Sequence, residues 1–487
     1  MLRPDEHRTG RTPRAAHLGA RLSLYQMFNL GFGATIGVGW VTVLGAWIAG
    51  AGSVGAALAF AGGAAVMMLI ALCYAELSSM YPESGGDMVY AHECFGVGAA
   101  FIVGWLLLLI FLSIMVFLAI SAGWVVAELV PGWRGPVLYR LLGADVAVGD
   151  VLTAVVGIAA IAWLNVRGGN SAARFQDVAT AIMCVAAVSF IGAGLLAGDT
   201  AHLTPLFSGA EVPARFMGIA GVFATTPLWY AGFNVVPQAI GERSPGVSPR
   251  RVAQTMLLGL AAAMVFYVLL IVSASMALPR EELLALPLPA AGAFESVLGS
   301  RAVGKIVLVA GLLGLVTSWN AVFFAGARVA FAMARARLLS PRLALTHRQH
   351  QSPVGAVLLI AATGLALAPL GVGFIGPLVT IAGSALAVLF LVVALTVVRL
   401  RHTRPDALRP FRLAGAHLVG GLAAIASLGM IVLNVIAGRS DGGVPFDWMI
   451  LLAWLALGYA VWSSGHTLRE SISREQRRSL LLGSDPL

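Results

Sequence analysis

Long apolar segments, separated by short polar stretches, follow one another along almost the whole chain. A helix needs about 20 apolar residues to cross about 30 Å of hydrocarbon, and the segments are of this length. The pattern predicts an all-α integral membrane protein with twelve transmembrane helices. The predicted helices lie at 23–49, 54–80, 97–130, 147–166, 175–197, 214–241, 252–278, 302–334, 353–373, 375–398, 411–437 and 446–465.

Two of these segments contain residues that break helices. The first has four glycines within 31–39, and the sixth has Pro227 and Gly232 within 225–234. Glycine costs about 1 kcal/mol and proline about 3 kcal/mol in a helix interior, so both helices are expected to be discontinuous. Broken helix persists in a membrane only where it is buried in protein or lines a watery cavity.

The two breaks lie five segments apart, at corresponding places in segments 1–5 and 6–10. This spacing predicts a five-plus-five inverted repeat with a binding site near the bilayer midplane. The alternative is that both stretches are faces of small residues where helices pack closely. A matched pair favours the cavity over this alternative.

Composition agrees with a membrane location. Hydrophobic residues make up 59% of the chain and charged residues 11%, whereas soluble domains carry about 25% charge. The net charge of +9 raises the possibility of nucleic acid as a partner. However, every basic residue except Lys305 is an arginine, and the arginines lie between the apolar segments. We therefore expect the lipid bilayer, and no nucleic acid, as a partner.

The arginines also predict the orientation. If the N-terminus is inside, 23 basic residues lie in inside stretches and seven lie outside, as the positive-inside rule requires. We therefore expect a multi-pass protein of the cytoplasmic membrane with both termini in the cytoplasm. The expected units are an N-terminal tail at 1–22, a core at 23–400, accessory helices 11 and 12 at 401–466, and a C-terminal tail at 467–487.

No pattern of catalytic or metal-ligating residues stands out. The stretch 50–55 matches G-x-G-x-x-G, but no strand precedes it and it joins two apolar segments. His92 and Cys94, or His347 and His350, lie in polar loops without a complete ligand set. We therefore predict neither an enzyme nor a cofactor.

Four stretches resemble the amino acid–polyamine–organocation superfamily. They are the glycine-rich 33–39, the run 74–87 (YAELSSMYPESGGD), 229–234 with the following Gly241-Glu242, and 320–335 with Asn320, Arg328 and Arg335. The run 74–87 is the most specific of them. The resemblance implies a secondary transporter that moves amino acids or related amines by alternating access.

The predicted site consists mainly of backbone. Where the first helix opens, the amides near Val38 and Gly39 would begin a half-helix whose positive end suits a carboxylate. Freed carbonyls would accept hydrogen bonds from an ammonium group, and the superfamily binds its substrates in this way. The predicted substrate-binding residues are Ala34, Thr35, Ile36, Gly37, Val38, Gly39, Trp229, Tyr230, Ala231, Gly232 and Asn234. Many relatives have an acidic residue in place of Asn234, which disfavours a polycationic substrate here.

The coupling ion is left open between sodium and a proton. Proton-coupled relatives carry a lysine where this chain has Met183, whereas sodium-coupled relatives place ligands where it has Thr317 and Ser318. We therefore hypothesise that these hydroxyls and the carbonyl of Ala34 form a sodium site, because hard cations take oxygen ligands. The alternatives are proton coupling through Glu76 or Glu242, and exchange without an ion.

Gating or structural roles are expected for residues near the cytoplasmic ends of the helices: Glu76, Gly85, Gly86, Asp87, Glu242 and Asn320. Gly86 is expected to allow a close backbone approach. Two other functions remain open. One is a permease for a small amine such as ethanolamine or a polyamine, and the other is a membrane sensor that binds such a ligand without moving it.

Overall fold

The computed structural model describes residues 21–37, 39–437 and 446–482. Ten of its helices are long and apolar enough to cross a membrane, and they coincide with ten of the predicted segments. The first predicted segment is a bent pair of helices, and the ninth is a shorter apolar helix at Val354–Leu370. The all-α transmembrane fold is thus confirmed, while the count of twelve and the inverted repeat stay predictions.

The long helices have these bounds: α4 (Ser53–Met80), α6 (Val97–Leu129), α7 (Val148–Val166), α8 (Gly169–Ala197), α9 (Val212–Tyr230), α11 (Pro249–Ala277), α14 (Arg301–Arg335), α16 (Ile375–Thr403), α17 (Ala416–Ala437) and α18 (Phe446–Ser464). Helix α15 (Val354–Leu367) is shorter, and α5 (Asp87–Phe95), α12 (Arg280–Ala285), α13 (Pro289–Leu298), α19 (His466–Glu470) and α20 (Arg474–Leu482) lie in connections between spans or after the last one. An antiparallel hairpin, β1 (Val137–Leu141) with β2 (Ala144–Ala147), precedes α7.

The first span is interrupted twice. Helix α1 (Leu24–Thr35) ends at the glycine-rich stretch, α2 (Gly39–Thr42) forms a single turn, and α3 (Leu44–Ala51) continues after Val43. The chain bends by 69° between Leu24–Thr42 and Leu44–Ala51. Helix α1 thus ends within the glycine-rich stretch 31–39, as its glycines predict, whereas the 69° bend lies beyond that stretch, at Val43.

The sixth span changes its helical pattern at the predicted place. After α9 come three short pieces, the 3-10 turn η2 (Ala231–Asn234), α10 (Val235–Ala239) and the 3-10 turn η3 (Ile240–Glu242). Helix α9 contains Pro227, which removes a backbone donor, and the tighter turn begins four residues later. Gly232 allows η2 to press on the broken end of α1, since a Cβ there would lie 2.1 Å from the Thr35 nitrogen.

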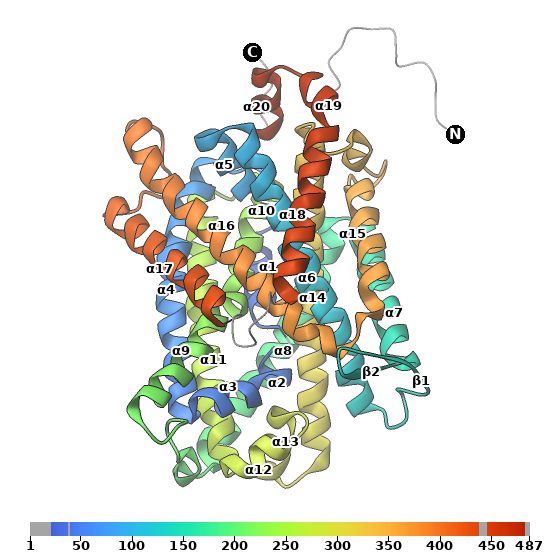
Figure 1. The fold of residues 1–487 in the computed structure, drawn as a ribbon, viewed down its shortest axis with the longest axis vertical. Helices are drawn as coiled ribbons and strands as arrows, with labels where there is room; N and C mark the ends of the chain where they lie inside the picture. Colours follow the sequence, from blue (N-terminus) through green and yellow to red (C-terminus); the bar gives the residue numbers. More distant parts are fainter. Residues whose placement is uncertain (1–20, 38, 438–445, 483–487) are drawn as a thin grey trace.

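Figure 1 shows the helices as one upright bundle, with α5, α19 and α20 at one end and α12 and α13 at the other. We call these the α20 end and the α13 end; the arginine distribution predicts that the α20 end is cytoplasmic. Helices α6 and α14 are mostly buried, whereas α17 and α18 are mostly exposed at the rim. The core therefore forms around α6, α14 and the two interrupted spans.

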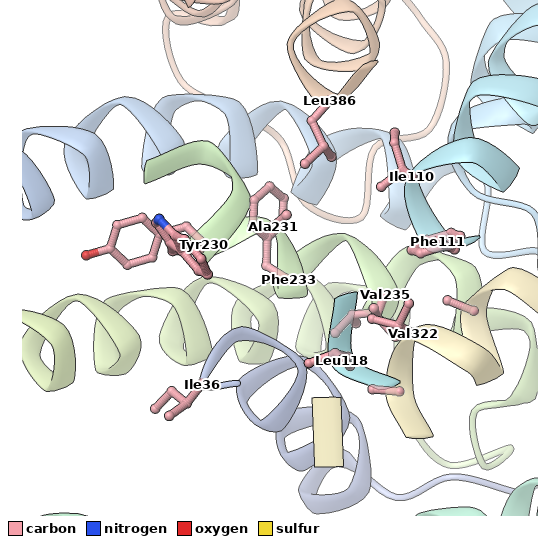
Figure 2. Packing of buried hydrophobic residues seen from close by; sticks show 14 of the residues in the cluster. Ile36, Ile110, Phe111, Leu118, Tyr230, Ala231, Phe233, Val235, Val322 and Leu386 are labelled. Atoms are coloured by element: carbon pink, nitrogen blue, oxygen red, sulfur yellow. The ribbon is translucent and has the colours of Figure 1, made fainter. Parts of the chain in front are cut away.

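Side chains from these elements interlock in the centre of the bundle. Figure 2 shows Phe233 of η2 and Val235 of α10 among apolar side chains of neighbouring helices, including Leu118 of α6, Val322 of α14 and Leu386 of α16. All of these side chains are buried. The tighter turn of the sixth span is thus enclosed by protein, as broken helix in a membrane requires.

At the α20 end, the chain before α1 pairs with the chain after η3. The Leu22 amide donates to the Glu242 carbonyl at 2.8 Å, and the Ser244 amide donates to the Leu22 carbonyl at 2.9 Å. Leu22 is almost completely buried there. These two backbone hydrogen bonds join the outer end of the first span to that of the sixth.

Candidate functional site: a cavity between the interrupted helices

A cavity of about 440 Å³ lies where the first span is interrupted. Its lining comes from five parts of the fold. These are the end of α1 with the following turn (Ala34, Thr35, Gly37, Gly39), α6 (Ser113, Ile114, Phe117, Leu118), the end of α9 (Leu228, Trp229), Tyr267 of α11 with Ser318 of α14, and α16 (Leu378, Val379, Ala382). The cavity therefore joins both interrupted spans to four continuous helices, α6, α11, α14 and α16.

Aromatic rings and hydroxyls fix one wall of the cavity. The Trp229 ring packs on the backbone of Gly39, where a Cβ would lie 2.5 Å from the ring, and the indole nitrogen donates to the Thr225 hydroxyl at 3.1 Å. The Tyr267 hydroxyl donates to the Thr35 carbonyl at 2.8 Å. One of the carbonyls freed by the break is thus held by α11.

Two hydroxyls of α14 face the carbonyls at the end of α1. Ser318 Oγ lies 2.7 Å from the Gly33 carbonyl and 3.1 Å from that of Ala34, while Thr317 Oγ1 lies 3.3 Å from the Gly33 carbonyl. Both side chains are buried. Four oxygens therefore gather beside the cavity, between α1 and α14.

Comparison with known proteins agrees with this architecture. The family described as "Amino acid permease" matches residues 22–458. The chain is a member of the amino acid permease family. It is 27% identical to the methylthioribose transporter of Bacillus subtilis over 93% of this chain and 96% of that protein. It is 25% identical to the branched-chain amino acid permease BcaP of the same organism over 91% and 92%. It is 27% identical to the human Asc-type amino acid transporter 1 over 63% and 57%.

Membership in this family confirms the superfamily resemblance and the expectation of a transporter rather than an enzyme. Six of the thirteen residues predicted to bind substrate or sodium line the permease cavity: Ala34, Thr35, Gly37, Gly39, Trp229 and Ser318. Val38 lies outside the described residues. The binding role of each residue stays a prediction.

The other predicted site residues of the permease lie behind the cavity. Ile36 is fully buried outside the lining, and the Tyr230 hydroxyl turns to the Phe60 carbonyl at 3.2 Å. Ala231 and Gly232 pack against the end of α1, and Asn234 is buried with its amide nitrogen without a hydrogen bond. These residues support the wall from behind, because the tight turn of η2 directs their side chains into the core.

The half-helix expected behind the carboxylate site is shorter than predicted. Helix α2 has only four residues, since Val43 (φ −120°, ψ −5°) interrupts the helix before α3 begins. A macrodipole is the sum of aligned peptide units, so one turn contributes little of the half charge expected from a long helix. Backbone amides next to Gly39 would therefore act as individual donors.

Reasoning from the sequence missed the walls that α6 and α16 contribute. Ser113, Ile114 and Phe117 lie in a span that is apolar on every face, and Leu378 and Val379 lie in another such span. Ser113 is one of two serines in α6, and a hydroxyl inside a long apolar span was the only available signal. Periodicity could not identify the inward face, because the buried and lipid-facing residues are equally apolar.

Each acidic residue predicted to act as a gate or a proton carrier has its own partners. Glu76 of α4 accepts hydrogen bonds from Arg401 and Arg409 and from the Leu413 amide. Glu242 of η3 lies 2.6 Å from Arg328 of α14, with both side chains 1% exposed. Two of the three fully buried carboxylates in the described part of the chain are therefore paired with arginines.

Asp87, the third of these carboxylates, has no basic partner. Gly86 has a φ of +36°, which glycine adopts readily, and turns the chain into α5. Asp87 Oδ2 then accepts a hydrogen bond from Gln238 of α10 at 2.7 Å, while Oδ1 has none. Burial raises the pKa of Asp87 to about 7. Gly85, also at positive φ, packs on α14.

Asn320 belongs to a buried amide cluster rather than to a gate contact with a charge. Its amide nitrogen donates to Gln176 Oε1 at 3.1 Å and to the Ala172 carbonyl at 3.2 Å, and its oxygen accepts from Asn165 at 3.2 Å. These contacts join α7, α8 and α14. Met183 of α8 lies close by, with its sulfur 3.0 Å from a Cβ built on Gly314.

Proposed function

We propose that this permease moves a zwitterionic amino acid with an apolar side chain across the cytoplasmic membrane by alternating access. The single observation that carries the proposal is the chemistry of the cavity wall. None of the described residues that line it has an ionisable carboxylate, amine or guanidinium. Its apolar lining includes Ile114, Phe117, Leu228, Leu378 and Val379.

An apolar wall opposite a polar backbone suits a molecule with two different ends. The turn around Gly37 and Gly39 offers amides to a carboxylate, and the Ala34 carbonyl offers an acceptor to an ammonium group. A substrate that carries a further positive charge would lose its hydration without gaining a counterion, which is costly in a buried site. The lining therefore disfavours polyamines and cationic amino acids.

The names of the relatives span several substrates. BcaP of Bacillus subtilis is a branched-chain amino acid permease, which agrees with the apolar wall. Another relative is a methylthioribose transporter, and the name of that substrate does not indicate a carboxylate. Two Arabidopsis relatives are cationic amino acid transporters. Because identities are near 25%, the wall of this chain is a better guide than any one name.

We further propose sodium as the coupling ion. The hydroxyls of Thr317 and Ser318 and the carbonyls of Gly33 and Ala34 supply the oxygens that a hard cation prefers. The residue at the position of the lysine in proton-coupled relatives is Met183, which carries no charge. Glu76 and Glu242 each form an ion pair with arginines, so neither carboxylate faces the cavity as an unpaired group.

The test is uptake by purified protein in liposomes from a defined mixture of leucine, alanine, lysine, ethanolamine, putrescine and methylthioribose, read by mass spectrometry. We expect accumulation of leucine and, at lower affinity, alanine. Accumulation of the amines or of methylthioribose alone would overturn the substrate class. Saturable leucine binding with no accumulation or counterflow would show a sensor instead of a transporter.

Ion replacement is the second arm of the same experiment. Uptake in sodium is compared with uptake in choline, at equal pH inside and outside. We expect at least a tenfold lower initial rate in choline. An unchanged rate, with uptake driven instead by an imposed pH gradient or by internal amino acid, would favour a proton or exchange.

A further inference from the structure

A second hollow of the permease opens on its outer face, away from the substrate cavity. It has about 670 Å³ of space and lies between the first part of α6 and the last part of α18. Aromatic rings line it, namely Phe101 and Trp105 of α6 with Tyr459 and Trp462 of α18. We call this hollow the α6–α18 crevice.

A pair of tryptophans joins the two helices that form the crevice. Trp105 and Trp454 exchange hydrogen bonds, each indole nitrogen donating to the other residue's carbonyl, at 2.9 and 3.1 Å. Their rings stack with centroids 4.6 Å apart. The indole nitrogens of both tryptophans are thus satisfied within the protein, and most side chains that line the crevice are apolar.

Two glycines give the crevice its depth. Gly98 has no atom within 4 Å of the position where a Cβ would stand, so the space in front of it is open. Gly458 brings the backbone of α18 onto the Trp105 ring. On the outer rim, Ile102 and Tyr459 are 56% and 74% exposed, which places the opening toward the lipid. The occupant must therefore enter from the membrane.

Positive charge collects where the crevice reaches the α20 end. The Arg469 guanidinium stacks on the Trp462 ring at 3.7 Å and donates to the Trp462 carbonyl. Arg477 donates to the carbonyl of Arg469, and Arg474 begins the same short helix, α20. Within the described residues, no acidic side chain forms an ion pair with any of these three arginines.

The arginines act on one another through their charge. Burial, followed by the positive charges of Arg469 and Arg474, lowers the pKa of Arg477. By contrast, the next residue, Arg478, is neutralised by Glu93 of α5 at 2.9 Å. The mouth of the crevice is therefore a cationic site without a counterion, directly above an apolar slot.

We propose that the α6–α18 crevice binds an anionic phospholipid, with an acyl chain against the aromatic rings and the headgroup phosphate at Arg469 and Arg474. The crevice is apolar along its length and positively charged at its mouth, and this difference distinguishes a phospholipid from a second copy of the chain. A phospholipid is apolar where the crevice is apolar and negative where the arginines lie, at the depth where tryptophan and arginine prefer the interface. A second copy of the chain would have to bring acidic residues to this mouth.

The arginine distribution assigns the α20 end to the cytoplasm, and inner leaflets carry anionic lipids. Each basic residue near such a surface favours an anionic lipid about fivefold. Arg469, whose guanidinium stacks on Trp462, and the exposed Arg474 should therefore together give a clear preference. The proposal does not depend on the transported substrate, so its failure would leave the proposed transport function untouched.

The experiment is native mass spectrometry of the full-length permease reconstituted with equal amounts of phosphatidylglycerol and phosphatidylcholine. We expect phosphatidylglycerol to be retained about 25-fold over phosphatidylcholine, which is about fivefold for each of the two arginines. Arg469→Gln and Arg469→Gln/Arg474→Gln should lower this preference about fivefold for each arginine removed. Arg250→Gln, an exposed arginine in the first turn of α11, is the control that should keep it.

Gly98→Leu tests the slot rather than the charge. A Cβ at position 98 meets nothing within 4 Å, so the leucine side chain should occupy the open space. Retention of both lipids should then fall, while the preference in what remains is kept. Gly192→Leu on α8, where a Cβ also meets nothing, is the matched control. Equal retention of the two lipids by the wild type, or unchanged retention in Gly98→Leu, would overturn the proposal. A dimer that forms only without lipid and is lost in Gly98→Leu would assign the crevice to a second copy.

Discussion

Arg328 and Glu242 form an ion pair in which Nε and Oε1 are 2.6 Å apart and both side chains are 1% exposed. The guanidinium also stacks on Phe324 at 3.3 Å, while its second terminal nitrogen, Nη1, has no hydrogen bond. The pair joins the end of the sixth span to the middle of α14. It therefore lies between an interrupted helix and a continuous one.

Removing one partner of this pair should destabilise the permease strongly. Arg328→Met leaves the Glu242 carboxylate buried without a counterion, which typically costs about 3–5 kcal/mol. Thermal unfolding in detergent should show a fall in Tm of many degrees. Arg328→Met/Glu242→Gln should recover much of the loss, because it removes both charges. A double variant no more stable than the single one would contradict this reading.

Ile114 should set the size of the transported side chain. Ile114→Ala removes apolar contact that only a large side chain reaches, and missing methylene contacts typically change selectivity by 10-fold or more. We expect KM for leucine to rise about tenfold and KM for alanine to stay within about twofold. Leu358→Ala, an exposed position on α15, is the control. Equal changes for both substrates would indicate a general packing defect.

Substitution of Ser318 should change the apparent affinity for sodium more than the apparent affinity for the substrate. Ser318→Ala removes one of the four oxygens beside the end of α1, so the sodium concentration for half-maximal uptake should rise about tenfold. Ser427→Ala removes an equally buried hydroxyl in α17 and should change nothing. A rate that falls equally at every sodium concentration would argue against ion binding at Ser318.

Gly86 should tolerate no side chain. A Cβ there would lie 2.7 Å from Gln238 Nε2, and the φ of +36° is strained for other residues. Gly86→Leu should therefore lower the yield of folded protein in size-exclusion chromatography. Gly96→Leu also has positive φ, but it has open space around its Cβ and separates backbone strain from the clash. Similar yields for the two variants would mean that the contact with Gln238 is unimportant.

Asp87 should make stability depend on pH. Its pKa is raised to about 7 in the folded protein, so the folded state holds a proton that the unfolded chain has lost above about pH 4. This group's contribution is complete below the unfolded pKa and is lost as pH rises through about 7. The groups that face it are Tyr74 of α4, Tyr90 of α5 and Gln238 of α10.

The measurement is Tm at pH 5 and pH 8. Asp87→Asn keeps the size of the side chain and can still bond Gln238, but it cannot ionise. We expect the fall in Tm from pH 5 to pH 8 to be smaller in Asp87→Asn than in the wild type. If both proteins lose the same amount, other groups determine the pH dependence.

The sequence predicted the spans, because length and apolarity determine them. It also predicted the place of both interruptions, because glycine and proline determine where a helix breaks. It predicted that Ala34, Thr35, Gly37, Gly39 and Trp229 belong to one site, and these five residues line one cavity. It did not predict the contributions of Phe117 or Val379, since a span that is apolar all round hides its inner face. Nor did it predict that Tyr230 turns away, because the rotation of η2 depends on the tertiary packing of Gly232 on α1.

The backbone pairing of Leu22 with Glu242 and Ser244 has a mechanical consequence. Two hydrogen bonds in a buried position connect the outer ends of the first and sixth spans. When one of these ends moves, the other must move with it or the two hydrogen bonds must break. In the alternating access proposed above, the two interrupted helices are therefore expected to move together.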